Sequence, residues 1–168
     1  MKKYIPVILF LMLTSTLMAQ NTPIAAWQEK WNNSENYLIE IAQAMPQEKY
    51  TFKPTEREMT FADQLLHIAN NINWLSNTYF NGEKIDKYQS ITSKEETIAI
   101  LHKAFTNGRN AIGKTNPEDL IAEVEFFAGS KTKLQILNLL QDHVTHHRGQ
   151  VIVYLNLNDI TPPRYIGW

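Results

Sequence analysis

Apolar residues recur at helical spacing in four separate stretches of this sequence. In each stretch large apolar side chains return every three to four positions, which places them on one face of an α-helix. The four stretches cover approximately residues 24–44, 60–82, 93–113 and 132–158. The sequence therefore predicts four amphipathic helices of similar length, separated by loops that contain Pro or Gly.

Local start signals support the last three of these helices. Each begins with Ser or Thr followed three residues later by an acidic residue or Gln, the pattern of a capping box. The pairs are Thr60 with Asp63, Ser93 with Glu96, and Thr132 with Gln135. These signals fix where the helices begin more closely than hydrophobic periodicity does.

Four such helices predict an all-α fold, a four-helix bundle. The stretch "EVEFFAGS" before the last helix is extended in character and is expected to form a short strand or an irregular cover. Nothing else in the sequence is typical of a sheet. The residues expected in the core are Trp27, Trp31, Leu38, Leu66, Trp74, Leu101, Phe105, Leu137, Leu140 and Val144.

Residues 1–20 are expected to lie outside this fold as a secretory signal peptide. Lys2 and Lys3 are followed by an apolar run and then by small and polar residues up to Ala19. The apolar run is shorter than the about 20 residues that a membrane-spanning helix needs. An uncleaved N-terminal anchor is the alternative. We expect an exported protein, periplasmic or secreted, whose single domain is residues 21–168 and which keeps no stable membrane anchor after cleavage.

Composition excludes several classes of protein. The 16 basic and 17 acidic residues nearly balance, which is not the charge pattern of a nucleic-acid-binding protein. The chain has no cysteine, so it cannot contain disulfides or a lipidated cysteine. The fold must therefore be stabilised by its core alone.

Candidate chemistry is concentrated in "QDHVTHHRGQ", residues 141–150, which holds three of the five histidines. His143 and His147 are four residues apart, so they lie on the same side of a helix and can bind one metal ion. His67 lies in the middle of the second helix and can supply a third nitrogen if that helix neighbours the last one. His146 and His102 are expected outside such a site. A structural role for these histidines is the alternative that periodicity alone leaves open.

Gly149 is unusual within a helix, where glycine is about 1 kcal/mol less favourable than alanine. Its presence predicts that another backbone or a ligand approaches the helix closely at this position.

Three segments together resemble the DinB/YfiT-like family of metalloenzymes. They are "HVTHHRGQ" on the last helix, "MPQEKYTFKPTEREMTFADQLLHIA" through the second helix, and the C-terminal "ITPPRYIGW". The resemblance covers nearly the whole chain after residue 20. It implies a four-helix bundle with up-down-down-up topology, a homodimer in many members, and a divalent ion held by His67, His143 and His147. Characterised relatives include S-transferases and isomerases that use small thiols. A signal peptide departs from the typical cytosolic member. It argues against a thiol cofactor here, because an exported compartment holds little reduced small thiol.

Three histidine ligands leave a coordination position open, which is typical of a catalytic metal site. Such a donor set suits Zn, Ni or Fe and does not identify the metal. The candidate catalytic residues are Asp63, one turn before His67, and Gln150. We expect a metal-dependent hydrolase or transferase that acts on a small molecule. The alternatives are a non-catalytic metal- or ligand-binding envelope protein, a purely structural bundle, and a bundle that binds haem through two histidines.

Overall fold

The computed structural model describes residues 22–89 and 91–167, and the predicted signal peptide lies outside the described residues. The described regular structure is almost entirely helical. Its long helices are α2 (Pro23–Ala44), α3 (Phe61–Phe80), α4 (Lys94–Gly113) and α5 (Lys133–Asn156). Two short 3₁₀ helices, η1 (Gln47–Lys49) and η2 (Pro117–Ile121), lie in the connections. The predicted all-α class is therefore confirmed.

The helices begin at the predicted caps. The side chain of Thr60 accepts a hydrogen bond from the backbone N–H of Asp63 at 3.1 Å, and Ser93 caps α4 in the same way. Of the three predicted boxes, only the one at Thr132 is complete, because Gln135 also accepts from the backbone N–H of Thr132 at 2.8 Å. At Thr60 the carboxylate of Asp63 instead accepts from the threonine hydroxyl at 2.7 Å.

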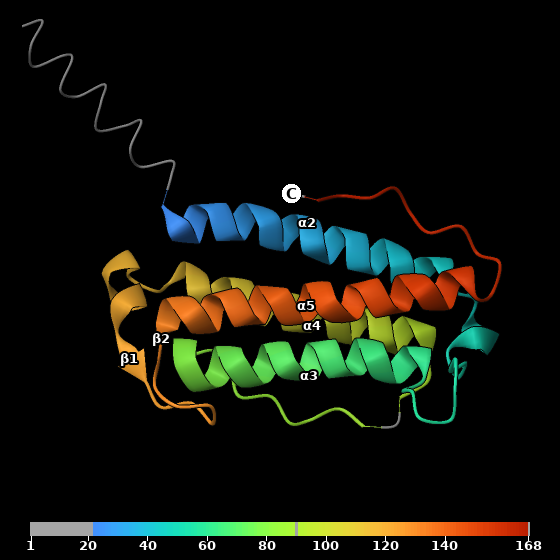
Figure 1. Cartoon of the computed structure of the whole chain (residues 1–168), viewed down its shortest axis with the longest axis horizontal. Coiled ribbons are helices and arrows are strands. Elements are labelled where there is room, and N and C mark those ends of the chain that lie inside the picture. The colour runs from blue at the N-terminus through green and yellow to red at the C-terminus, as the bar shows by residue number, and fades with distance from the viewer. Residues whose placement is uncertain (1–21, 90, 168) are drawn as a thin grey trace, which may run out of the picture.

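The four long helices form a bundle with up-down-down-up topology (Figure 1). α2 and α5 run in one direction, and α3 and α4 run in the other. Since α3 and α4 are parallel, the connection between them, described for residues 81–89 and 91–93, runs back along the length of the bundle. Each of α2 and α3 packs against both α4 and α5. α3 and α5, which carry the candidate histidines, are therefore antiparallel neighbours.

The core lies between the four helices and contains nine of the ten residues predicted for it. These are Trp27, Trp31, Leu38, Leu66, Leu101, Phe105, Leu137, Leu140 and Val144. The prediction for Trp74 is wrong, because 43% of this residue is exposed. Trp74 follows His67 by seven residues and so lies on the same outward side of α3. Its indole packs against Phe126, with ring centroids 6.3 Å apart.

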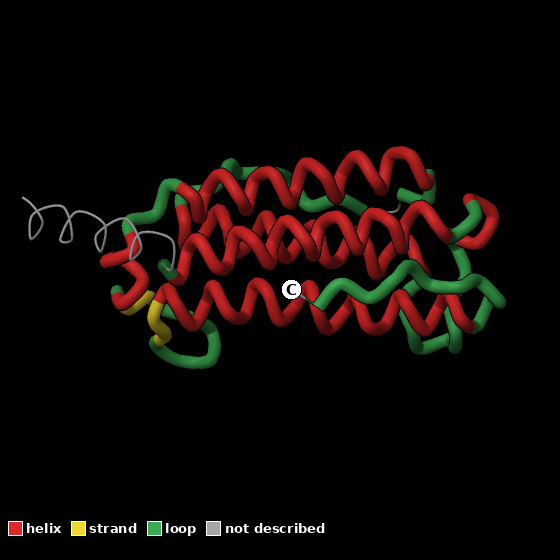
Figure 2. Tube along the Cα trace, turned by 90° about the horizontal axis from the view of Figure 1, so that it is seen from above, coloured by secondary structure: helices red, strands yellow, loops and turns green. Residues whose placement is uncertain are grey.

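The sheet is limited to one end of the bundle (Figure 2). β1 (Glu123–Val124) and β2 (Lys131–Thr132) pair antiparallel, and β2 leads directly into α5. β1 begins the stretch "EVEFFAGS", and β2 follows directly after its end. A short strand or an irregular covering segment was expected in this stretch. Within the described part of the chain, no helix is both long enough and apolar enough to cross a membrane.

Candidate metal centre

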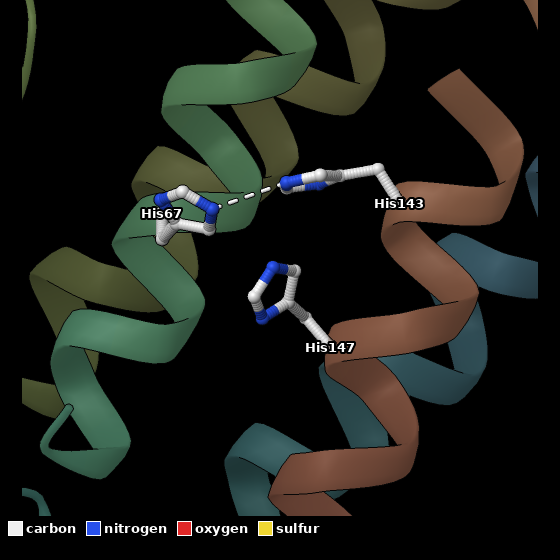
Figure 3. A group of neighbouring side chains, drawn as sticks. All are labelled: His67, His143 and His147. Atoms are coloured by element: carbon white, nitrogen blue, oxygen red, sulfur yellow. Dashed lines mark hydrogen bonds between the residues drawn. The ribbon is translucent and has the colours of Figure 1, made fainter. Parts of the chain in front are cut away.

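His67, His143 and His147 face one another between α3 and α5 (Figure 3). His67 extends from the middle of α3, and the other two come from successive turns of α5. His67 is exposed, His143 is half-buried and His147 is buried. The three rings thus form a site that has a buried inner side and an outer side open to solvent.

The ring nitrogens are close enough to share one ion. One nitrogen from each histidine lies within 4.8 Å of the other two, and this is a group of residues that can hold a metal ion. Nε2 of His143 lies 3.1 Å from Nε2 of His67. The ring centroids of His67 and His147 are 4.6 Å apart, and those of His143 and His147 are 4.5 Å apart. Imidazole nitrogens directed at a common centre are a suitable donor set for Zn, Ni or Fe ions.

A buried polar chain orients His147. Its Nδ1 lies 2.7 Å from Oε1 of Gln64, and Nε2 of Gln64 donates to the hydroxyl of Tyr154 at 3.3 Å. The Tyr154 hydroxyl donates in turn to the backbone carbonyl of Met59 at 2.7 Å. Because an amide oxygen only accepts, Nδ1 of His147 carries the proton, and Nε2 keeps its lone pair for a ligand. Partners of this kind fix the tautomer and orientation of metal-binding histidines.

The surroundings keep all three rings neutral. Burial lowers the pKa of His143 to about 3, and the nearby histidines His147, His67 and His146 add to this effect. Burial lowers the pKa of His147 to about 4, with further contributions from His67 and His146. The pKa of His67 is lowered by burial and then by the charge of Lys87. Metal ions bind neutral imidazole, so these shifts favour binding at neutral pH.

The other two histidines lie outside this group. His146 is exposed, and its ring packs edge-on against His147 with centroids 4.8 Å apart. His102 is on α4, where its Nδ1 lies 2.9 Å from a carboxylate oxygen of Glu35. Glu35 also pairs with Arg109. His102 therefore belongs to a separate ion-pair cluster between α2 and α4.

The candidate catalytic residues lie on different helices, Asp63 on α3 and Gln150 on α5. Asp63 is exposed one turn before His67, and its carboxylate is engaged by the hydroxyl of Thr60. Gln150 is half-buried on α5, one turn after His147, and its hydrogen bonding opposes the lowering of the His147 pKa. Asp63 therefore has a capping partner, whereas Gln150 interacts with a histidine of the triad.

No described part of the chain approaches Gly149 closely, so the backbone approach predicted from sequence is wrong. A Cβ atom added there would meet no described atom within 4 Å, and the residue is exposed. It points away from the triad, because it is two residues from His147 and so lies on the other side of α5.

Comparison with known proteins assigns the fold to a family. The model of the DinB family matches residues 12–165 of the sequence. The chain belongs to the DinB family. This family assignment agrees with the all-α bundle.

Individual DinB relatives are distant in sequence but close in fold. The chain is 25% identical to the uncharacterized protein YjoA of Bacillus subtilis (strain 168) over 124 residues, which are 71% of this chain and 80% of YjoA. The solved structure of YjoA has a TM-score of 0.71 at 19% identity, covering 83% of this chain and 96% of that one. A DinB-like protein from Bacillus cereus ATCC 10987 also has a TM-score of 0.71, at 21% identity, covering 83% and 95%. These likenesses establish the shared DinB fold.

Sequence reasoning did not identify Gln64 and Tyr154 as part of this DinB site. Gln64 is almost fully buried on α3, and its partners His147 and Tyr154 are 83 and 90 residues away along the chain. The only local signal is a polar residue at a position where the apolar side of α3 is expected. Such a residue needs a hydrogen-bond partner when it is buried.

Proposed function

We propose that this DinB-family protein holds one divalent metal ion through His67, His143 and His147. One observation carries the proposal: a ligand nitrogen of each histidine lies within 4.8 Å of the other two. The burial of His147 and its bond to Gln64 support the same role, because a histidine held in one orientation needs little rearrangement to bind an ion. The donor set suits Zn, Ni or Fe.

We propose further that the site is catalytic. Three protein ligands leave at least one position for water or a substrate, and an ion of this type lowers the pKa of bound water to about 7 or polarises a carbonyl group. The exposed side of His67 gives a small molecule access to that position. These features fit a metal-dependent hydrolase or transferase.

The protein side chains would contribute positioning and hydrogen bonds. Gln150 interacts with His147, so its amide is placed beside the proposed ion and is suited to hydrogen-bond a bound water or substrate. Asp63 would act as a base only if its carboxylate left the Thr60 hydroxyl, which lies 2.7 Å away. Gln150 is therefore the better supported of the two candidates.

Activity measurements separate an enzyme from a non-catalytic metal-binding protein. Metal-loaded wild-type protein should catalyse one of two reactions faster than His143→Ala. These are hydrolysis of 4-nitrophenyl acetate and attack of the cysteine thiol on 1-chloro-2,4-dinitrobenzene, which forms the thioether and releases chloride. Gln150→Ala should retain the metal and lose part of this rate. If wild type binds metal but is no faster than His143→Ala in either reaction, the non-catalytic alternative is favoured.

We propose that the protein acts outside the cytoplasm, as a periplasmic or secreted protein. The support is the arrangement of Lys2, Lys3, the apolar run and Ala19 at the start of the sequence. Mass spectrometry of the protein from its native host should show the loss of about twenty residues. Soluble protein that retains Met1 would contradict export.

A further inference from the structure

A pocket of about 500 Å³ opens beside the histidine triad. One side of it is formed by α3, including His67 and Trp74, and the other by the connection from α3 to α4, including Lys84, Ile85 and Lys87. Because His67 lines the pocket, a molecule bound there lies next to the proposed metal site. The volume is within the range of pockets that hold small organic ligands, about 300–1,000 Å³.

The pocket is positively charged. Two basic residues, Lys84 and Lys87, line the pocket. None of the described residues that line it is acidic. Neither lysine forms an ion pair with a described residue, although Asp86 lies between them in the sequence. The charge of Lys87 also reaches His67, whose pKa it helps to lower. A bound divalent ion would add to this positive potential and attract an anion.

The connection that forms this side of the pocket is held in place by asparagines. The side chain of Asn70 makes two bonds with the backbone of Tyr88, accepting from its N–H at 2.9 Å and donating to its carbonyl at 3.0 Å. The side chain of Asn107 makes the same pair of bonds with Glu83, at 2.8 and 3.1 Å. Residues 84–87 therefore lie between two fixed points, so the two lysines are placed by the fold.

The lining also contains a buried amide without a partner. Asn73 is 4% exposed, and its Oδ1 accepts from Asn107 at 3.1 Å. Its Nδ2 makes no hydrogen bond with a described residue, although buried amide groups are normally paired. Since Asn73 lines the pocket, the oxygen of a bound anion can supply the missing acceptor.

The remaining lining is apolar. Trp74 and Ile85 contribute side chains, and Trp74 is 43% exposed in spite of its large apolar surface. The Trp74 indole is supported by Phe126, so it forms a firm surface for a flat or apolar group. The pocket thus combines cationic and amide donors with an aromatic surface.

We propose that this pocket binds a small organic anion, a carboxylate or phosphate attached to a flat apolar group, as the substrate or ligand of the triad. Lys84 and Lys87 recognise the charge, Asn73 donates to an oxygen of the anion, and Trp74 contacts the apolar group. The inference rests on the proposed function only in assigning this molecule to the metal site. The anion binding itself depends on the residues of the pocket.

The test measures binding of two anionic probes, 2-naphthoate and 2-naphthyl phosphate, with neutral 2-naphthamide as the comparison. Dissociation constants are measured by isothermal titration calorimetry in low salt, with both zinc-loaded and chelator-treated protein. At least one anion should bind about tenfold more tightly than the amide, since hydrogen bonds to charged groups are stronger than neutral ones. The better anion indicates whether the natural group is a carboxylate or a phosphate.

Two double variants with equal charge change identify the responsible lysines. Lys84→Met with Lys87→Met should weaken anion binding about tenfold and leave 2-naphthamide binding and zinc content unchanged. Lys103→Met with Lys114→Met is the matched control, because both lysines are exposed on or just after α4 and line a different groove. This control should bind the anions as wild type does.

Failure of this inference and failure of the proposed function give different results. Lysine-dependent anion binding by a protein that takes up no zinc supports the pocket and contradicts the metal site. Zinc binding without lysine-dependent anion binding contradicts the pocket and leaves the metal site intact. If no anion binds, or if the two double variants behave alike, the inference is wrong.

Discussion

The Nδ1 atom of His147 lies 2.7 Å from Oε1 of Gln64, a contact that joins α5 to α3. Gln64 is held by Tyr154, whose hydroxyl bonds to the backbone of Met59. The ring of His147 therefore has one orientation and one tautomer, with Nε2 directed toward the other two histidines. This relationship makes Gln64 a positioning residue for the candidate metal centre.

Replacing Gln64 by methionine should reduce zinc affinity about 10–100-fold while leaving all three histidines in place. Methionine has a similar volume, but its thioether is only a weak acceptor for the hydrogen bond from the Nδ1–H of His147. Competition titration with a chromophoric chelator measures the affinity. Gln43→Met, at an exposed position on α2, is the matched control and should bind zinc as wild type does. Equal affinities for the two variants would show that the contact with Gln64 does not position His147.

The metal-free protein should lose stability as the pH falls from about 6.5 toward 4. The pKa values of His143 and His147 in the fold are about 3 and about 4, below the ordinary value of about 6.5. Within this window the unfolded chain binds protons that the folded chain does not, so acid favours unfolding. The stabilisation is fully present above about 6.5 and is lost as the pH approaches the folded values.

Urea unfolding of chelator-treated protein at several pH values measures this loss. A variant with His143→Gln and His147→Gln lacks the two titrating rings and should show a smaller decrease in unfolding free energy between pH 7 and 4.5. If the wild type and the double variant have the same pH dependence, the two rings are not held neutral by the fold.

Replacing Gly149 by alanine should raise the free energy of unfolding by about 0.5–1 kcal/mol. The added Cβ meets no described atom within 4 Å, and alanine is the better helix former. Gly129 is the contrasting position, because its φ of 90° is strained for any residue with a side chain, and Gly129→Ala should be destabilising. Thermal or urea unfolding of both variants tests the two signs. Destabilisation by Gly149→Ala would indicate that another molecule packs against α5 there.

The fold was predictable from sequence because its signals are local. Helical periodicity and the caps at Thr60, Ser93 and Thr132 lie within single helices, and the helices begin where these signals place them. Trp74 shows the limit of such reasoning. A large apolar residue at helical spacing was expected in the core, but its position seven residues after His67 turns it outward.

The site was only partly predictable, because sequence spacing relates residues within one helix and not between helices. The separation of four between His143 and His147 was enough to place them on the same side of α5. Their approach to His67 depends on the packing of α3 against α5. The sequence pattern did not predict that packing, and only the resemblance to a family implied it. Gln64 gave only the signal of a polar residue on the apolar side of α3, because its partners are distant in sequence. The lysine-bearing connection gave no signal, because it has no periodicity.

Zinc binding by single alanine variants of His67, His143, His146 and His147 tests the central claim most directly. Equilibrium titration should give one zinc ion per wild-type chain. Loss of any of the three ligands should weaken binding more than about 100-fold, since removing a ligand should have a larger effect than removing a residue that only orients one. His146→Ala should bind nearly as wild type does, because His146 is exposed and lies outside the group. A wild type that takes up no divalent ion, or a His146→Ala variant that loses zinc as severely as His147→Ala, would contradict the account.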